Sequence, residues 1–274
     1  MILSRTDFFD RHDDNARNFM PGQRQTLARL LDRCYDLRLA ADPRTRRLRA
    51  AAATLAPQRV LVVGVEVPHR RGAFGPILAQ LASDRHHVAS AIVPMADQGK
   101  FANVMDAISK APEPVHAYDW LIVVDDDVAL VPDFTDRYLA LATATRLVIS
   151  QPAHRFRSYT THPITRRHYG RFVRATRFVE IGPLTVIAQT AFDQLLPFPP
   201  SRWCYGIDLL WSATASAENW AMGIVDALPL RHLRPVGGGY SMDEAAAEGR
   251  ELLGRHGVHL TRAEVFTDLG ERFQ

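Results

Sequence analysis

The sequence predicts an α/β fold, with parallel strands at the centre of a sheet and a helical extension before it. From Arg59 onward, short apolar, β-branched runs alternate with helical patterns, which is typical of buried strands joined by helices. Residues 1–57 carry helical periodicity instead. The chain has 274 residues, 47% of them hydrophobic and 23% charged, which is the balance of a globular protein with a sizeable core.

Residues 1–57 are expected to form a helical extension. Apolar residues recur at i, i+3, i+4, i+7 and i+8 on one helix face, namely Leu27, Leu30, Leu31, Cys34 and Tyr35. A second helix follows Pro43 and opens with a basic cluster, namely Arg44, Arg46, Arg47 and Arg49. Such a helix usually presents a solvated face, and the other interpretation is contact with a membrane surface or a partner.

The remaining elements follow from periodicity and breaker residues. Continuous apolar or β-rich runs predict strands at residues 60–65, 88–93, 120–124, 148–149, 178–187 and 223–226. Helical spacing predicts helices at residues 77–81, 101–108 and 208–217. Capping-box patterns that begin at Ser241 and Thr261 predict two short helices that close the chain.

Bulk properties narrow the function. The formal net charge of +3 is too small to favour nucleic acid as a partner, and Cys34 and Cys204 match no metal or redox spacing. The N-terminus lacks a signal-peptide core, and no stretch approaches the roughly 20 apolar residues that span a bilayer. These features predict a cytoplasmic protein. The other interpretation is a cytoplasmic protein that contacts the inner face of the membrane peripherally.

Three consecutive aspartates, Asp125, Asp126 and Asp127, directly follow the strand predicted at 120–124. They occupy the carboxyl end of a central strand, where α/β sheets bind ligands. Carboxylates this close repel one another unless a cation or hydrogen-bond donors compensate them. Mg²⁺ or Mn²⁺ would be the simple compensation, and an exposed acidic turn before the next helix is the other interpretation.

Residues 118–128, with the sequence YDWLIVVDDDV, resemble the DxD segment of GT-A glycosyltransferases. Phosphatases of the haloacid dehalogenase type share this pattern in part. The resemblance implies a GT-A-like (Rossmann-like) mixed central sheet flanked by helices, and a divalent metal, Mn²⁺ or Mg²⁺, as cofactor. It also implies a nucleoside-diphosphate sugar donor, with a UDP-sugar favoured. Asp125 would then approach the ribose, Asp126 would lie beside the donor, and Asp127 would ligate the metal.

Two upstream segments are expected to face the nucleotide. GKFANVMDA, at residues 99–107, is similar to the Gly-Lys…Asn element of the family, which implies that Lys100 and Asn103 bind the donor. A lysine meets a diphosphate as a point charge. Glu66 and Arg70 follow the first strand and are further candidates, although EVPHRRG at 66–72 departs from the usual turn of the family and leaves base recognition open.

Two downstream segments extend the resemblance. In WCYGIDLLW, at residues 203–211, Asp208 opens a helix where the family commonly has its catalytic base, although a carboxylate there also caps a helix. Its neighbours Trp203, Tyr205 and Gly206, with Trp211, are expected to line a sugar-stacking wall. His232 follows the last strand and resembles the histidine that completes the metal shell. The glycines at 237–239 form a loop over the diphosphate or a plain linker.

Residues 151–177 are rich in arginine and histidine and are expected on the acceptor side. If this stretch were a helix, Arg167, Arg171 and Arg174 would share one face. Such a face suits an anionic acceptor, for example a phosphorylated sugar or a lipid-linked diphosphate. The other interpretation is an arginine-rich surface loop. No nucleic-acid partner is expected, because the charge of the whole chain stays low.

The resemblance covers roughly residues 58–236 and predicts two parts, a helical extension at 1–57 and a catalytic domain at 58–274. The latter divides into a nucleotide-sugar half at about 58–130, an acceptor half at about 131–236 and C-terminal helices at 240–274. The predicted function is metal-dependent transfer of a sugar from a nucleotide-sugar to an acceptor. Two alternatives stay open, a metal-dependent nucleotidyltransferase or phosphohydrolase that uses the same aspartates and a non-catalytic nucleotide-sugar-binding protein.

Overall fold

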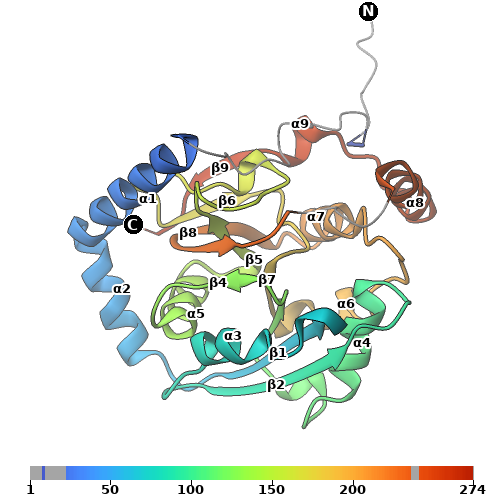
Figure 1. The fold of residues 1–274 in the computed structure, drawn as a ribbon, viewed down its shortest axis with the longest axis horizontal. Helices are drawn as coiled ribbons and strands as arrows, with labels where there is room; N and C mark the ends of the chain where they lie inside the picture. Colours follow the sequence, from blue (N-terminus) through green and yellow to red (C-terminus); the bar gives the residue numbers. More distant parts are fainter. Residues whose placement is uncertain (1–7, 10–22, 236–240, 274) are drawn as a thin grey trace, which may run out of the picture.

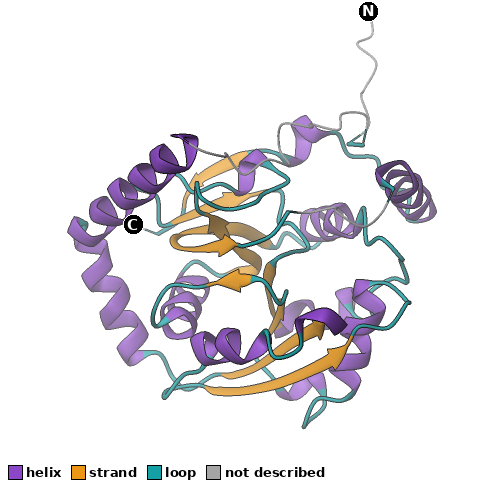
Figure 2. Ribbon diagram, viewed as in Figure 1, coloured by secondary structure: helices purple, strands orange, loops and turns teal. Residues whose placement is uncertain are grey.

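The computed structural model describes residues 8–9, 23–235 and 241–273. Within them, one mixed nine-stranded sheet has helices against both faces (Figures 1 and 2), which confirms the predicted fold class of a mixed central sheet flanked by helices. The strands are β1 (Arg59–Glu66), β2 (His87–Pro94), β3 (Trp120–Val124), β4 (Val128–Ala129), β5 (Leu147–His154), β6 (Val173–Thr176), β7 (Leu184–Ala188), β8 (Ala221–His232) and β9 (Asp268–Glu271). The α-helices are α1 (Gln23–Ala41), α2 (Pro43–Thr54), α3 (Phe74–Leu81), α4 (Lys100–Ser109), α5 (Phe134–Ala144), α6 (Phe192–Leu195), α7 (Ile207–Ala217), α8 (Met242–Arg255) and α9 (Arg262–Val265).

The sheet changes direction at β7. Its hydrogen-bonded order is β2-β1-β3-β7-β5-β8-β6-β9, and β4 pairs with β8 off this path. β1 is parallel to β2 and β3, and β5 is parallel to β8, whereas β7 is antiparallel to β3 and β5. The carboxyl ends of β1, β3, β5 and β8 and the beginning of β7 therefore meet at one edge of the sheet. In open α/β sheets, this is the edge where ligands bind.

The β1 strand shows why the sheet has a core on each side. Val60 and Val62 belong to one apolar cluster, and Leu61 and Val63 belong to the other, because successive side chains point to opposite faces. Side chains of α2, α3 and α5 complete the first cluster, and those of α4, α6 and α7 complete the second. A strand covered on both faces is apolar without alternation, which is the pattern in the sequence.

The helices α1 and α2 lie along one side of the sheet (Figure 1). Leu48 and Ala52 of α2 are buried in the first cluster. The helix α1 adds polar contacts, since the Asp32 carboxylate accepts the backbone N–H groups of Phe156 and Arg157 at 3.0 and 3.2 Å. The two helices thus brace the segment that follows β5.

The ends of the last two helices follow the sequence pattern. The Ser241 hydroxyl accepts the backbone N–H of Glu244 at the beginning of α8. At α9 the full capping box is present, because the Thr261 hydroxyl accepts the backbone N–H of Glu264 and the Glu264 carboxylate accepts the backbone N–H of Thr261. These reciprocal bonds satisfy donors that a helix N-terminus leaves without intrahelical partners.

The second half of the sheet differs most from the prediction. Only residues 184–187 of the stretch expected as a strand at 178–187 join the sheet, as part of β7, and β6 and β9 were not predicted. Between β5 and β6 the chain forms loops and one short 3-10 turn, Pro163–Thr165, so Arg167, Arg171 and Arg174 do not share a helix face. Much of the segment at 151–177 that is rich in arginine and histidine is therefore loop, and part of it packs against α1.

Candidate functional site

The three aspartates lie in a turn that two strands hold in place. Asp125 directly follows β3, and its backbone N–H donates to the Pro183 carbonyl at 2.8 Å. Two residues after Asp126, β4 pairs with the end of β8 and sets Val128 opposite His232. A further bond, from the Leu233 N–H to the Asp127 carbonyl at 2.9 Å, closes the arrangement. Strand pairing therefore brings a histidine next to the acidic turn.

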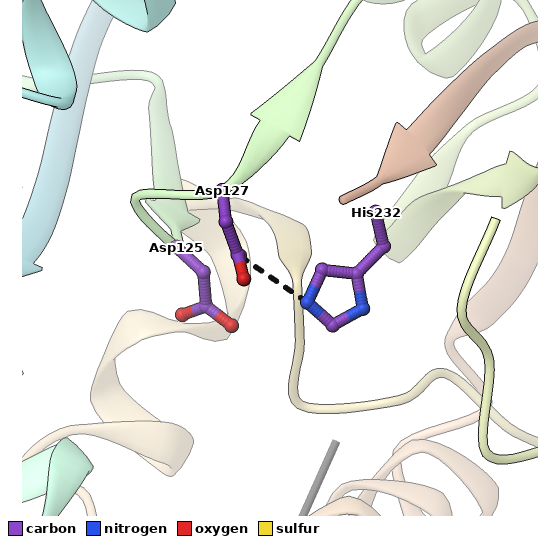
Figure 3. Close-up of side chains that lie close together, drawn as sticks. All are labelled: Asp125, Asp127 and His232. Atoms are coloured by element: carbon purple, nitrogen blue, oxygen red, sulfur yellow. Dashed lines mark ion pairs between the residues drawn. The ribbon is translucent and has the colours of Figure 1, made fainter. Parts of the chain in front are cut away.

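Asp125, Asp127 and His232 form a group that could hold a metal ion (Figure 3). Each offers one ligand atom, and these atoms lie within 4.8 Å of one another. His232 Nε2 is 3.2 Å from Asp127 Oδ1. Two carboxylates and an imidazole suit a divalent cation such as Mn²⁺, and three protein ligands leave coordination positions for phosphate or water oxygens. The donor set therefore fits the metal that the resemblance implies.

The electrostatics of Asp127 and His232 are those of an ion pair. Burial alone would raise the pKa of Asp127, but the hydrogen bond and charge of His232 hold it below its ordinary value. Burial would likewise lower the pKa of His232, and Asp127 raises it instead. A cation that binds these two side chains must displace the proton from His232, so its affinity depends on pH.

Two cations from elsewhere in the chain neutralise the other aspartates. Lys100 Nζ lies 2.6 Å from Asp125 Oδ1, and Arg70 lies 2.6 Å from an Asp126 carboxylate oxygen. Arg70 also reaches Asp127 at 3.5 Å. Burial opposes the charge of Lys100, but Asp125 raises its pKa above the ordinary value. The repulsion expected among three adjacent carboxylates is thus offset by Lys100, Arg70 and His232, each facing a different aspartate.

Asp126 lies in a different environment from its two neighbours. Its carboxylate is buried, it pairs with Arg70, and it accepts the Val67 N–H at 3.4 Å. Burial raises its pKa, against the effect of Arg70. These contacts tie Asp126 to the turn after β1, where Glu66 Oε1 accepts the Gly72 N–H at 2.7 Å. Donor binding by Glu66, Arg70 and Asp126 remains a prediction, and their contacts show that they order this turn.

Two glycines allow the close approach of Lys100 to Asp125. Gly99 has φ +88°, and a Cβ there would overlap the Ser201 carbonyl oxygen. A Cβ at Gly182 would lie 2.9 Å from Lys100 Nζ and 3.1 Å from Asp125 Oδ2. Positive φ and lack of a side chain are what glycine supplies. The backbone conformation of Gly99 therefore sets the direction in which α4 begins, which places Lys100 at the site. The missing side chain of Gly182 leaves space for the Lys100–Asp125 pair.

Asn103, which was expected to bind the donor, makes hydrogen bonds within its own loop. It is buried, and its amide oxygen accepts the N–H groups of Ala96 and the Gln98 side chain. Its amide nitrogen donates to the carbonyls of Ala96 and Gly99. A side-chain amide offers two donor hydrogens and two acceptor sites, and all are used here. Asn103 therefore orders the 96–99 loop before Lys100, and its contact with a nucleotide remains a prediction.

Glu180 and Asp208 are two buried acids that influence each other, and Glu180 also interacts with His232 of the metal group. Asp208 lies in the first turn of α7, where its carboxylate accepts the Leu209 N–H at 2.9 Å, and burial raises its pKa to about 7. Burial also raises the pKa of Glu180 to about 8, and the Asp208 carboxylate adds to this shift. The Glu180 carboxyl is 11% exposed, close to the 10% of Asp127 and 9% of His232. The three side chains thus have the same limited access to solvent.

Aromatic side chains around Asp208 are arranged differently from the expected sugar-stacking wall. Trp211 lies in the core, with its ring 5.7 Å from that of Phe101 and 5.9 Å from that of Phe198. The Tyr205 ring packs beside Phe9, 6.3 Å away. The backbone N–H of Trp203 donates to Glu248, and its ring lies beneath Arg202. Trp211 is therefore excluded from the wall, while sugar contact by Trp203 and Tyr205 remains a prediction.

Gly206 has a conformational role that its residue type explains. It precedes α7 with φ +88°, and a Cβ there would lie 3.2 Å from the Gly249 carbonyl oxygen of α8. Side chains other than glycine rarely adopt this backbone conformation. The residue turns the chain into α7 and so sets the position of Asp208. Its contact with substrate remains a prediction, and the glycines at 237–239 lie outside the described residues.

The sequence reasoning missed the residues that support His232. Ser158 Oγ accepts the His232 backbone N–H at 2.8 Å and lies 3.0 Å from His154 Nδ1. The other ring nitrogen of His154, Nε2, is 3.9 Å from Glu180 Oε2, and neither atom has a hydrogen-bond partner within the described part of the chain. The available signals were a lone glutamate inside the apolar run FVEIGP and a histidine at the end of β5.

The predicted anion-binding surface of residues 151–177 is wrong for two of its three arginines. Arg174 is fully buried in β6 and pairs with Asp226 at 2.7 Å. Arg167 is buried beneath α1 and pairs with Asp36 at 2.8 Å. Buried guanidinium groups require such partners. These two arginines form ion pairs inside the protein, and their burial keeps them from contact with an anionic acceptor.

Comparisons with known proteins give a similarity of fold only. No protein-family model and no curated protein matches the sequence. Solved structures with a similar fold include A197 from STIV, GalNAc-T7 with UDP, GalNAc and Mn²⁺, and TarS of S. aureus. Their sequence identities are 12%, 10% and 9%, and their TM-scores are 0.43, 0.46 and 0.47.

The matched regions cover 64%, 73% and 75% of this chain, in the same order, and 86%, 48% and 44% of those proteins. The chain thus spans less than half of the length of GalNAc-T7 and TarS. At these identities and TM-scores the likeness assigns neither a family nor an activity. The functional argument depends on the residues of the site.

Proposed function

We propose that this protein is a metal-dependent glycosyltransferase of the GT-A type, which moves a sugar from a nucleoside-diphosphate sugar to an acceptor. The observation that supports it is the convergence of Asp125, Asp127 and His232 beside Lys100 at the carboxyl end of the sheet. A divalent cation held by these three side chains would supply charge neutralisation for the leaving diphosphate. Lys100, a point charge next to the same site, adds to that neutralisation.

In this proposal Asp208 is the general base. It is buried at the beginning of α7, and its pKa of about 7 lets it accept a proton from an acceptor hydroxyl near neutral pH. An acceptor oxygen that loses its proton to Asp208 attacks the anomeric carbon, while the bond from that carbon to the diphosphate breaks. Burial raises the pKa of Glu180 to about 8, so in this proposal Glu180 carries a proton near neutral pH while Asp208 acts as the base.

The test is a Mn²⁺-dependent binding and hydrolysis screen against a panel of nucleotide-sugars, UDP-sugars first. Many glycosyl-transfer sites slowly hydrolyse the donor when water replaces the acceptor. We expect metal-dependent release of one nucleoside diphosphate, lost in Asp127→Ala and in His232→Ala. Asp243→Ala, on the exposed first turn of α8, is the matched control and retains activity.

The same screen separates the alternative functions. Turnover of simple phosphate esters, or of a nucleoside triphosphate plus a sugar phosphate, without donor hydrolysis would replace the proposal with a phosphohydrolase or nucleotidyltransferase. Tight nucleotide-sugar binding that is unchanged by Asp208→Asn, with no turnover under any acceptor, would indicate a binding protein. Loss of turnover in Asp208→Asn with intact donor binding supports the base role.

A further inference from the structure

The outer face of α1 carries apolar side chains that no described element covers. Opposite its buried face, leucines and a cysteine follow one another at helical spacing, namely Leu27, Leu30, Cys34 and Leu37. The three leucines are 55%, 56% and 63% exposed, which makes them among the most exposed large apolar residues of the described chain. Together they form an apolar stripe along the helix, which we call the α1 stripe.

Exposed arginines flank the α1 stripe and continue on the neighbouring helix. They are Arg29, Arg33, Arg46, Arg47 and Arg49. Figure 1 shows α1 and α2 following one another along one side of the molecule, with the sheet on their inner side. Arg29 and Arg33 thus share α1 with the stripe, and Arg46, Arg47 and Arg49 are exposed on the helix that follows it.

The acidic residues of α1 and of the α1–α2 junction do not offset this charge. Asp32 is buried beneath α1, where it accepts the backbone N–H groups of Phe156 and Arg157. Asp36 pairs with Arg155 and Arg167, both at 2.8 Å. Asp42 is buried, caps α2 and pairs with Arg44 and Arg38. Every carboxylate of residues 23–54 thus lies beside an arginine outside this set, since Asp32 is 3.5 Å from Arg167, and no ion pair within the described residues involves the five exposed arginines.

We propose that the outer face of α1 and α2 docks on an anionic lipid surface, with the α1 stripe among the lipid headgroups and the arginines on their phosphates. An apolar stripe with basic flanks is the pattern of helices that lie in a membrane interface. The proposed contact is peripheral, and no helix in the described part of the chain is long and apolar enough to cross a bilayer. It does not depend on the proposed activity.

Charge complementarity favours lipid over a second copy of the chain. In a two-fold dimer through this face the same patch meets itself, so the arginines of one protomer face those of the other. Such like charges repel, whereas an anionic leaflet attracts each basic side chain by about 1 kcal/mol, roughly a fivefold gain per residue. An anionic lipid surface can therefore take up the leucines and also attract the arginines, which a second copy of the chain cannot do.

The test is co-sedimentation of the full chain with vesicles of phosphatidylcholine, alone or with about 30% phosphatidylglycerol. We expect binding only to the anionic vesicles, weaker at high salt. The variant Arg46→Ala/Arg47→Ala/Arg49→Ala should weaken it on the order of 100-fold. The variant Leu27→Gln/Leu30→Gln/Leu37→Gln should weaken it at least about tenfold and remove the part that resists salt.

Matched controls change exposed residues elsewhere, namely Leu269→Gln and the triple variant Arg85→Ala/Arg177→Ala/Arg255→Ala. Both should bind vesicles as the unchanged chain does, and thermal unfolding shows that every variant folds. Binding that is equal on neutral and anionic vesicles, or equally weakened by the control arginines, overturns the proposal. So does a concentration-dependent dimer that the leucine variant dissociates while vesicles bind nothing, because the occupant is then a second copy.

Discussion

Asp125, Asp126 and Asp127 share one sequence motif but have three different partners. Asp125 faces Lys100, Asp126 faces Arg70, and Asp127 faces His232. The first and third also belong to the possible metal group, and the second does not. A motif of identical residues is thus divided by the turn into carboxylates that differ in chemistry, because successive side chains leave the backbone in different directions.

The first prediction separates Asp127 from Asp126. Asp127→Asn should weaken Mn²⁺ binding by at least about 100-fold, since it removes a charged ligand, whereas Asp126→Asn should leave it within about tenfold. Asp126→Asn should instead lower the free energy of unfolding by about 1–3 kcal/mol, because Arg70 loses its charged partner. Calorimetric titration with Mn²⁺ and urea unfolding measure the two effects. An equal loss of metal affinity in both variants would contradict this division.

The second prediction concerns Glu180 and pH. Its pKa is raised from 4.5 to about 8 in the folded chain, mainly by burial. The folded state therefore holds this proton more tightly, so the associated stability is complete below about pH 4.5 and is lost as pH rises to about 8. Glu180→Gln, which cannot ionise, should flatten this decline and stabilise the metal-free chain at pH 8, on the order of 3 kcal/mol.

Thermal unfolding in EDTA between pH 5 and pH 8.5 measures the effect. Glu248→Gln is a matched control on α8, away from the buried pair. If Glu180→Gln lowers the melting temperature at pH 8 as much as at pH 5, then Glu180 is ionised in the folded chain at both values and its proposed protonation near neutral pH is wrong.

At the scale of elements, the sequence predicts a strand well where the pattern of its own residues shows which faces are buried. The central strands β1 and β3 were predicted to within two residues, because burial on both faces makes them continuous apolar runs. The strands β6 and β9 were not, since each has four residues and lies toward one side of the sheet. Their pairing, and not their composition, makes them strands.

The residues of the site were likewise predicted where they follow a local sequence pattern and missed where they do not. The acidic turn was recognised because it directly follows a strand, and its resemblance to a known motif pointed to His232. That Val128 pairs with His232 is a property of β4 and β8 that no local pattern contains. Glu180 was missed because a single glutamate in an apolar run carries no spacing signal, and the role of Asn103 in its own loop was missed because its partners are set by the folded loop and not by a local pattern.

A third prediction follows for the loop that α1 braces. Asp32 is buried and holds the N–H groups of Phe156 and Arg157, next to the Ser158 that supports His232. Asp32→Ala should lower the free energy of unfolding by about 2–4 kcal/mol, because it leaves buried donors without an acceptor. Asp97→Ala, at a side chain that is 92% exposed and within the described residues pairs only with exposed Arg202, should cost less than about 1 kcal/mol. Urea unfolding compares the two, and equal losses would contradict the bracing role.

Across the whole molecule, the first helices are joined to the last strand. Arg44 of α2 donates to the Phe273 carbonyl at 3.2 Å and lies 3.8 Å from Glu271 of β9. The Glu271 carboxylate in turn accepts the N–H groups of Phe172 and Val173, both at 3.0 Å. With Leu48 in the core, these contacts make α1 and α2 part of the packing around the sheet. The division at residue 57 therefore describes the order of elements along the chain and predicts nothing about independent folding.

The fourth prediction is that residues 23–273 unfold as one cooperative unit. Calorimetry of the full chain should give a single transition, with equal calorimetric and van't Hoff enthalpies. A chain shortened to residues 58–274 loses Leu48 from the core and the carboxylates that pair with buried Arg167, so we expect exposed apolar surface and a broad transition. Dye binding and near-ultraviolet circular dichroism detect this state. If the shortened chain melts at the same temperature as the full chain and with the same sharpness, then α1 and α2 are accessories, and the loop that carries Ser158 keeps its shape without them.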